Sequence, residues 1–223
     1  MKPGWKLLLG AAVAAVAWFG GRPLLRRASF FKARQVEVVG ARFLDPTHVA
    51  SRLRLPPEMS LFDSFEPLAA RIDSIPGVEG ARVTRRWPAT VSVRLRERQP
   101  VALTPHKGRL ALIDADGTVL PFDPTRAPAD LPVSRGGKAV ARVLARVREA
   151  DPAMFAAVSE ARGRGSDVVL EVGKVRYLFR EDAGADAIRA AAAVARDLGR
   201  RGRPHAELDA RFSDRVFVRG KPL

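Results

Sequence analysis

The sequence of residues 35–101 decides the fold: QVEVVGARFLDPTHVASRLRLPPEMSLFDSFEPLAARIDSIPGVEGARVTRRWPATVSVRLRERQPV. Its first residues, 35–40, alternate apolar and polar side chains and then reach Gly40, which predicts a short strand. Residues 90–96 alternate more regularly, so their apolar members lie on one face of a second strand. These inward-facing residues are Val91, Val93 and Leu95.

A first helix is predicted between these strands. Asp45-Pro46 has the residue types of a helix N-cap followed by proline at the first helical position. Val49 and Leu53 then recur four residues apart, as one face of a helix requires. We expect the helix to end at Pro56-Pro57, because proline cannot continue the hydrogen-bonding pattern.

A second helix and a further strand complete the unit. The helix begins near Glu66-Pro67 and ends at Pro76-Gly77, and its apolar residues Leu68, Ile72 and Ile75 are expected to be buried. Residues 78–86 form a strand, joined to the last one by Trp87-Pro88-Ala89. The order is β-α-α-β-β, with both helices on one face of a three-stranded sheet.

Close to the N-terminus lies an uncharged apolar segment, residues 7–21 (LLLGAAVAAVAWFGG). As a helix it is about 22 Å long, short of a hydrocarbon core of about 30 Å. Including Trp5 and Leu25, with Lys6 and Arg22 reaching the headgroups, makes it long enough for a membrane anchor, and we assign the anchor and its flank to residues 7–25. The predicted anchor residues are Leu7, Leu8, Leu9, Val13, Val16, Trp18 and Phe19.

A cleavable signal peptide is the alternative for this segment, with a cleavage site at Ala15-Val16-Ala17. The anchor is favoured because apolar residues continue through Trp18 and Phe19. More positive charge follows the segment than precedes it, which would keep the C-terminal side in the cytoplasm. The residues alone therefore leave both cleavage and orientation open.

Composition limits the possible functions. The chain has 223 residues, a formal net charge of +15 and no cysteine, which excludes disulfides and thiolate metal sites. The positive charge favours anionic surfaces, either nucleic acid or acidic lipid. Arginines are scattered along the chain and only one tyrosine is available for base stacking, so proximity to lipid is favoured and no nucleic-acid partner is expected.

Three motifs in this region resemble a known family. They are the run 75–78 (IPGV), the step 83–88 (VTRRWP) and the step 91–102 (VSVRLRERQPVA), which follow the strand at 36–40. Together they are similar to the POTRA domain of FtsQ, also called DivIB, a bacterial cell-division protein.

The resemblance implies an α+β, bitopic protein of the inner membrane. Its parts would be a cytoplasmic tail at 1–6, a transmembrane anchor and flank at 7–25, a POTRA domain at 35–101 and an FtsQ-type β domain at 102–220. The N-terminus would be cytoplasmic and the two domains extracytoplasmic, against the charge count.

Beyond Pro100 the pattern predicts a mostly antiparallel β domain with two helices. The helices are residues 138–150, with an apolar stripe, and 186–198, which Gly199 should end. Residues 121–134 are predicted to be a loop, and Asp114-Ala115-Asp116-Gly117 a turn, since the further ligands of a calcium loop are missing. The remaining strands are predicted at 102–104, 110–113, 119–120, 156–161, 168–172, 175–179, 206–210 and 215–219, with a turn at 162–165.

The last strands hold the candidate partner site. Residues 208–212 (LDARF) followed by 216–218 (VFV) resemble the family's terminal region, where FtsB adds a strand to the sheet edge. The resemblance implies that Arg211 pairs with an acidic group on the guest strand and that Phe212 and Phe217 are apolar anchors. Val216 and Val218 complete the site, and Arg164 could add a basic contact.

Two features of the sequence leave alternatives open at this site. The residues themselves equally allow both aromatic side chains to be core and Arg211 to be solvated. Relatives often have leucine-glycine where this chain has Leu178-Phe179-Arg180, which puts the local turn and the start of the last helix in doubt.

No catalytic constellation is found in the sequence. His48, His106 and His205 are far apart, and phosphate-binding and nucleophile-elbow motifs are missing. Glu97, between two arginines, is interpreted as a member of an ion pair. We therefore predict no enzyme activity, cofactor or metal. The expected function is a division scaffold that binds FtsB-like and FtsL-like partners at the septum, with an exported POTRA-containing assembly factor or a basic nucleic-acid-binding protein as alternatives.

Overall fold

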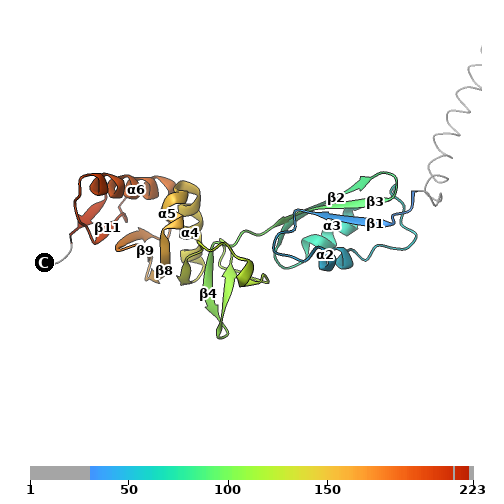
Figure 1. Ribbon diagram of the computed structural model, residues 1–223, viewed down its shortest axis with the longest axis horizontal. Coiled ribbons are helices and arrows are strands. Elements are labelled where there is room, and N and C mark those ends of the chain that lie inside the picture. Colours follow the sequence, from blue (N-terminus) through green and yellow to red (C-terminus); the bar gives the residue numbers. More distant parts are fainter. Residues whose placement is uncertain (1–30, 213, 221–223) are drawn as a thin grey trace, which may run out of the picture. The chain divides into compact units, whose positions relative to one another are not determined.

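The computed structural model describes residues 31–212 and 214–220, and the chain divides into two compact units after Glu97 (Figure 1). The predicted tail and anchor, residues 1–6 and 7–25, lie outside the described residues, as does the alternative cleavage site. Within the part of the chain that is described, no helix is both long and apolar enough to cross a membrane.

The first unit has the predicted order of elements. Its sheet consists of β1 (Gln35–Val39), β2 (Val78–Arg86) and β3 (Thr90–Glu97) in the order β1-β3-β2. Strand β1 is parallel to β3, while β2 and β3 form an antiparallel hairpin. The helices α2 (Pro46–Leu53) and α3 (Glu66–Asp73) lie together on one face of this sheet (Figure 1).

The core of the first unit lies between the sheet and the two helices. Val91 and Val93 of β3 are fully buried, as are Val49 and Leu53 of α2. On the opposite face of β3, Arg94 and Arg96 are exposed. The alternation in the sequence thus identifies the buried face, as expected for a sheet that is covered on one side.

Helix α2 ends earlier than predicted. It stops at Leu53, before the proline pair, because Arg54 adopts a left-handed conformation with φ 45° and donates its N–H to the Ser51 carbonyl. The Arg71 side chain of α3 donates from Nη1 to the Leu53 carbonyl at 2.9 Å. Carbonyl groups at the C-terminal end of a helix have no hydrogen-bond donors within the helix. Here the Arg54 N–H and the Arg71 side chain donate to them.

Glu97 has contacts that the ion-pair interpretation did not include. Its side chain is buried and accepts hydrogen bonds from the backbone N–H groups of Arg42, Phe43 and Leu44 at 2.8–3.1 Å. The carboxylate thereby fixes the loop that leads into α2. The neighbouring arginines pair elsewhere: Arg96 with Glu79 and Arg98 with Asp114.

The second unit is built on one nine-stranded sheet with the order β12-β11-β10-β9-β8-β7-β4-β5-β6. Neighbours are antiparallel except for three pairs: β10 with β11, β4 with β7 and β7 with β8. The strands are β4 (Ala102–His106), β5 (Arg109–Ile113), β6 (Val119–Leu120), β7 (Val133–Arg135), β8 (Val158–Arg164), β9 (Asp167–Val172), β10 (Val175–Arg180), β11 (Glu207–Asp209) and β12 (Phe217–Arg219).

Two long helices cover this sheet. Helix α4 (Lys138–Ala150) packs against β7, β8 and β9, and α6 (Ala185–Arg200) packs against β10 and β11. The two helices also contact each other, and their apolar residues share one core with the sheet. The stripe predicted on α4 is buried throughout: Val140, Val143, Leu144 and Val147.

Several short elements of this unit differ from the prediction. The end of the loop predicted at 121–134 belongs to β7 (Val133–Arg135), which lies between β4 and β8. A third α-helix, α5 (Pro152–Ala156), and a 3-10 turn, η2 (Pro124–Arg126), were missed. Asp151 explains α5, because its carboxylate accepts a hydrogen bond from the Met154 N–H and caps the helix.

The strand boundaries in this unit also need correction. The strand predicted at 156–161 starts at Val158 and runs to Arg164, through the residues predicted to be a turn. The turn itself includes Gly165, whose φ is 61°. Leu178, Phe179 and Arg180 end β10 in regular pairing with β9, so the doubt about a local turn is resolved in favour of strand. Helix α6 contains Gly199 and ends one residue later.

Candidate partner-binding edge

Strand β12 forms one edge of the nine-stranded sheet. It pairs with β11 through the register Glu207↔Arg219, Leu208↔Val218 and Asp209↔Phe217, and no described strand lies on its other side. All three of its residues are exposed. An edge strand presents unpaired backbone N–H and C=O groups, which a further strand can satisfy.

Next to this edge are two exposed aromatic side chains. The rings of Phe212 and Phe217 lie 5.2 Å apart in a T-shaped arrangement, and their exposed fractions are 48% and 46%. Val218 is 44% exposed, whereas Val216 is half-buried against the core. The alternative in which both aromatic side chains belong to the core is therefore wrong.

Arg211 has two carboxylate partners within the unit. Its Nε and Nη2 donate to the two oxygens of Asp209 at 2.8 and 2.7 Å, and Nη1 donates to Asp167 Oδ2 at 2.8 Å. Asp209 is buried in β11, while Asp167 begins β9. Hydrogen bonds from Arg211 hold the pKa of Asp209 below its ordinary value. Arg211 therefore fastens the chain that leads to the edge, and its contact with a guest strand stays a prediction.

A second arginine is on the edge strand itself. Arg219 Nη1 lies 3.1 Å from Glu207 Oε1, and Arg176 Nη2 lies 3.2 Å from Glu207 Oε2. The Glu207 side chain is nearly buried, whereas that of Arg219 is 63% exposed. Arg219 thus presents a positive charge at the open edge. Arg219 lies in the strand predicted at 215–219, but only the register of the folded sheet brings it beside Glu207.

Arg164 is not next to β12. It ends β8 and faces Asp167 across the β8–β9 hairpin, and three strands, β9, β10 and β11, separate β8 from β12. Its neighbour Asp167 forms an ion pair with Arg211, so Arg164 lies near the Arg211 ion pairs. Its direct contact with a strand added at β12 stays a prediction.

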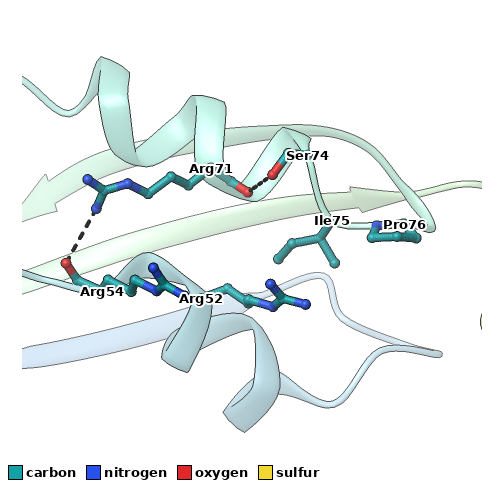
Figure 2. Close-up of a pocket in the computed structure, with 6 residues that line it drawn as sticks. All are labelled: Arg52, Arg54, Arg71, Ser74, Ile75 and Pro76. Atoms are coloured by element: carbon teal, nitrogen blue, oxygen red, sulfur yellow. Dashed lines mark hydrogen bonds between the residues drawn. The ribbon is translucent and has the colours of Figure 1, made fainter.

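The first unit contains a cleft of about 280 Å³ lined by Arg52, Arg54, Arg71, Ser74, Ile75 and Pro76 (Figure 2). Arg71 donates to carbonyl groups at the end of α2, and the Ser74 hydroxyl donates to the Arg71 carbonyl at 2.7 Å. No carboxylate or imidazole lines the cleft. Its residues therefore supply no base that could activate Ser74 as a nucleophile. Among the described residues, no cluster of potential ligands could hold a metal ion.

Comparisons with known proteins find similarity to one family. Residues 31–98 match the family model described as "POTRA domain, FtsQ-type". The cell division protein FtsQ of Zymomonas mobilis is 30% identical over 110 residues, which are 49% of this chain and 35% of the relative. The chain is thus similar to FtsQ/DivIB proteins, and its residues 31–98 match their POTRA domain. FtsQ of Streptomyces bingchenggensis is 32% identical over 57% of this chain and 48% of its own length.

The match to these FtsQ proteins is partial in length. FtsQ of Mycolicibacterium smegmatis is 28% identical over 77% of this chain and 49% of its own length. The chain thus spans from about a third to about half of these three relatives. A solved structure of the major extracytoplasmic domain of DivIB from Geobacillus stearothermophilus is a weak match, with 21% identity and a TM-score of 0.36 over 47% of this chain and 97% of that one.

Proposed function

We propose that this chain is a division scaffold that binds its partner by accepting a strand at β12. The observation that carries the proposal is the open edge, whose three residues are exposed and whose Phe217 contacts the exposed ring of Phe212. Similarity to a cell-division family supports the same role. The chemistry is that of β-augmentation, in which backbone hydrogen bonds give affinity and side-chain pockets give specificity.

The side chains around the edge define the guest. Phe212 and Phe217 offer a surface to apolar residues of an added strand, and aromatic anchors of this kind dominate interface energies. Arg219 and Arg215 are exposed and favour acidic residues at the guest's ends. A short amphipathic strand with flanking carboxylates fits, as part of an FtsB-like protein that is itself paired with an FtsL-like one.

The proposed location follows from the family. The apolar segment at 7–25 would be a single-pass anchor in the inner membrane with a cytoplasmic N-terminus, and both described units would be extracytoplasmic at the division septum. The POTRA domain would meet other division components. The chain would act by localisation and assembly, with no enzymatic reaction of its own.

A pair of matched variants tests the proposal. Phe217→Lys/Val218→Lys places charge on the β12 edge, which blocks strand addition. Leu110→Lys/Val119→Lys makes the same change at exposed apolar residues of β5 and β6, at the other end of the same sheet. In cells we expect only the β12 variant to lose mid-cell localisation of a fluorescent fusion and co-purification of the FtsB-like protein.

Equal loss in both variants, with both folded, would mean that the surface charge and not the β12 edge matters. Retention of the partner by the β12 variant would contradict strand addition at this edge.

A further inference from the structure

Three aromatic side chains gather at one end of the POTRA domain. Phe31, Phe62 and Trp87 are mutually in contact, with ring centroids 5.2 Å (Phe31–Phe62), 5.5 Å (Phe31–Trp87) and 5.3 Å (Phe62–Trp87) apart. We call these three residues the aromatic cluster. Trp87 is 51% exposed and the two phenylalanines are half-buried. The cluster therefore shows a substantial apolar surface to its surroundings.

Three separate segments of the chain build this cluster. Trp87 is in the β2–β3 connection, Phe62 is in the α2–α3 connection and Phe31 precedes β1. Backbone hydrogen bonds hold them together: Leu61 N–H to the Phe31 carbonyl at 2.9 Å, and Ala33 N–H to the Met59 carbonyl at 2.8 Å. These hydrogen bonds fix the segment that carries Phe31 against the connection that carries Phe62.

The aromatic cluster lies where the described chain enters the domain. Figure 1 shows this entry at the end of the sheet where β2 ends. Only nine residues, 22–30, separate Phe31 from the apolar segment 7–21. Nine residues span at most about 30 Å even when fully extended. If the apolar segment is in a bilayer, as the proposed function holds, the aromatic cluster must stay close to that bilayer.

The chemistry of the aromatic cluster matches a membrane–water interface. Tryptophan is enriched there because it combines a large apolar ring with a polar N–H. Two of the neighbouring cations are already paired, Lys32 with Glu58 and Arg86 with Glu37. The proposed contact is that of the rings, and it does not require anionic lipid.

We propose that the aromatic cluster seats the POTRA domain on the membrane surface, with Trp87 in the headgroup region. This inference rests on the anchor in the proposed function. It extends that function, because a seated domain has one fixed face toward the bilayer and presents its remaining faces to division partners. One apolar contact thereby restricts the orientation of the domain.

Trp87 can be observed alone, because the chain has three tryptophans and the other two are Trp5 and Trp18. The full chain carrying Trp5→Phe/Trp18→Phe is reconstituted into phosphatidylcholine vesicles that contain lipids brominated near the headgroup or near the bilayer centre. Bromine quenches tryptophan only at short range. We expect Trp87 to lose emission, with a greater loss for the shallow bromine, and to do so without anionic lipid.

Two single-tryptophan variants serve as controls. Trp5→Phe/Trp18→Phe/Trp87→Phe/Leu110→Trp places the probe at an exposed residue of β5 in the other unit, and its emission should not change. Trp5→Phe/Trp87→Phe keeps Trp18, which should be quenched if the anchor is inserted. A quenched Trp18 with an unquenched Trp87 would overturn the seating while leaving the anchor intact.

The remaining outcomes are also decisive. An unquenched Trp18 would refute the anchor, and with it the seating. Quenching of Trp87 only with phosphatidylglycerol present would contradict a contact that depends on the rings. Protection of Trp87 from acrylamide without bromine quenching would show that another protein, such as a second copy of the chain, covers the aromatic cluster.

Discussion

At the scale of single residues, Arg211 is the side chain on which the candidate edge depends. Replacing it by methionine in Arg211→Met leaves Asp209 buried without its main partner, because three of the hydrogen bonds on these carboxylates come from Arg211. We expect a loss of about 2–4 kcal/mol in the free energy of unfolding of the second unit. Urea unfolding, followed by the fluorine signal of 3-fluorotyrosine at Tyr177, measures it.

Arg215→Met is the matched control for this substitution. Its ion pair with Asp214 is exposed on both sides, at 62% for each side chain, so its loss should change stability by less than about 1 kcal/mol. Equal effects of the two substitutions would show that the Arg211 ion pairs do not stabilise the unit.

Asp209 makes the stability of the second unit depend on pH in the acidic range. Its pKa is lowered in the folded state by the hydrogen bonds from Arg211, so the unfolded chain binds the proton more readily. The stabilisation is present above the ordinary aspartate pKa of about 3.9 and is lost as the pH falls through the lower folded value. The stability difference between the natural chain and Asp209→Asn should therefore shrink below about pH 4. A difference that stays constant from pH 7 to pH 3 would contradict this account.

At the scale of elements, Gly40 determines how β1 ends against β3. Its φ is 93°, and a Cβ atom at this position would overlap the backbone carbonyl oxygen of Leu95. We expect Gly40→Ala to destabilise the first unit by about 2–4 kcal/mol, because strain in a left-handed conformation adds to a clash with a backbone atom that cannot move away. Chemical denaturation of the Trp5→Phe/Trp18→Phe chain, monitored by the emission of Trp87, measures the change.

Gly108→Ala separates the two contributions. Its φ is 77°, but open space surrounds the position, so only the conformational cost of about 1 kcal/mol remains. If both substitutions lower the free energy of unfolding by the same amount, the clash with Leu95 does not contribute to the effect of Gly40→Ala.

Elements with a regular pattern could be predicted from the sequence, and irregular ones could not. The strands of the first unit and the stripe of α4 follow the periods of strand and helix closely. Strand β7 has three residues, too few for any period, and it exists because β4 and β8 lie on either side of it. Helix α5 has only five residues, too few for a helical period, and it depends on a single cap at Asp151.

The candidate site was predictable in composition but not in its connections. The family pattern identified Arg211, Phe212 and Phe217, and the sequence placed them near the last strands. The partnership of Arg211 with Asp167 spans 44 residues, so only the folded sheet brings them together. The buried role of Glu97 depends in the same way on a loop more than 50 residues earlier in the chain.

At the scale of the whole molecule, each unit has a core of its own. Ile72 belongs to the core of the first unit and Leu144 to that of the second, and both are fully buried. Ile72→Ala and Leu144→Ala should each lower the stability of its own unit by about 2–5 kcal/mol and leave the other nearly unchanged. In the Trp5→Phe/Trp18→Phe chain, fluorinated Trp87 and Tyr177 report the two units separately, since each is then the only residue of its type. A single transition shared by both probes would contradict independent cores.

The central claim is that β12 accepts a strand from a partner. Amide hydrogen exchange of the full chain, alone and in complex with the FtsB-like and FtsL-like proteins, tests it most directly. We predict that exchange at residues 216–219 slows strongly in the complex, because a guest strand satisfies the outward backbone groups of β12. Unchanged exchange at these residues, with protection appearing instead along another edge such as β2 or β6, would contradict the account.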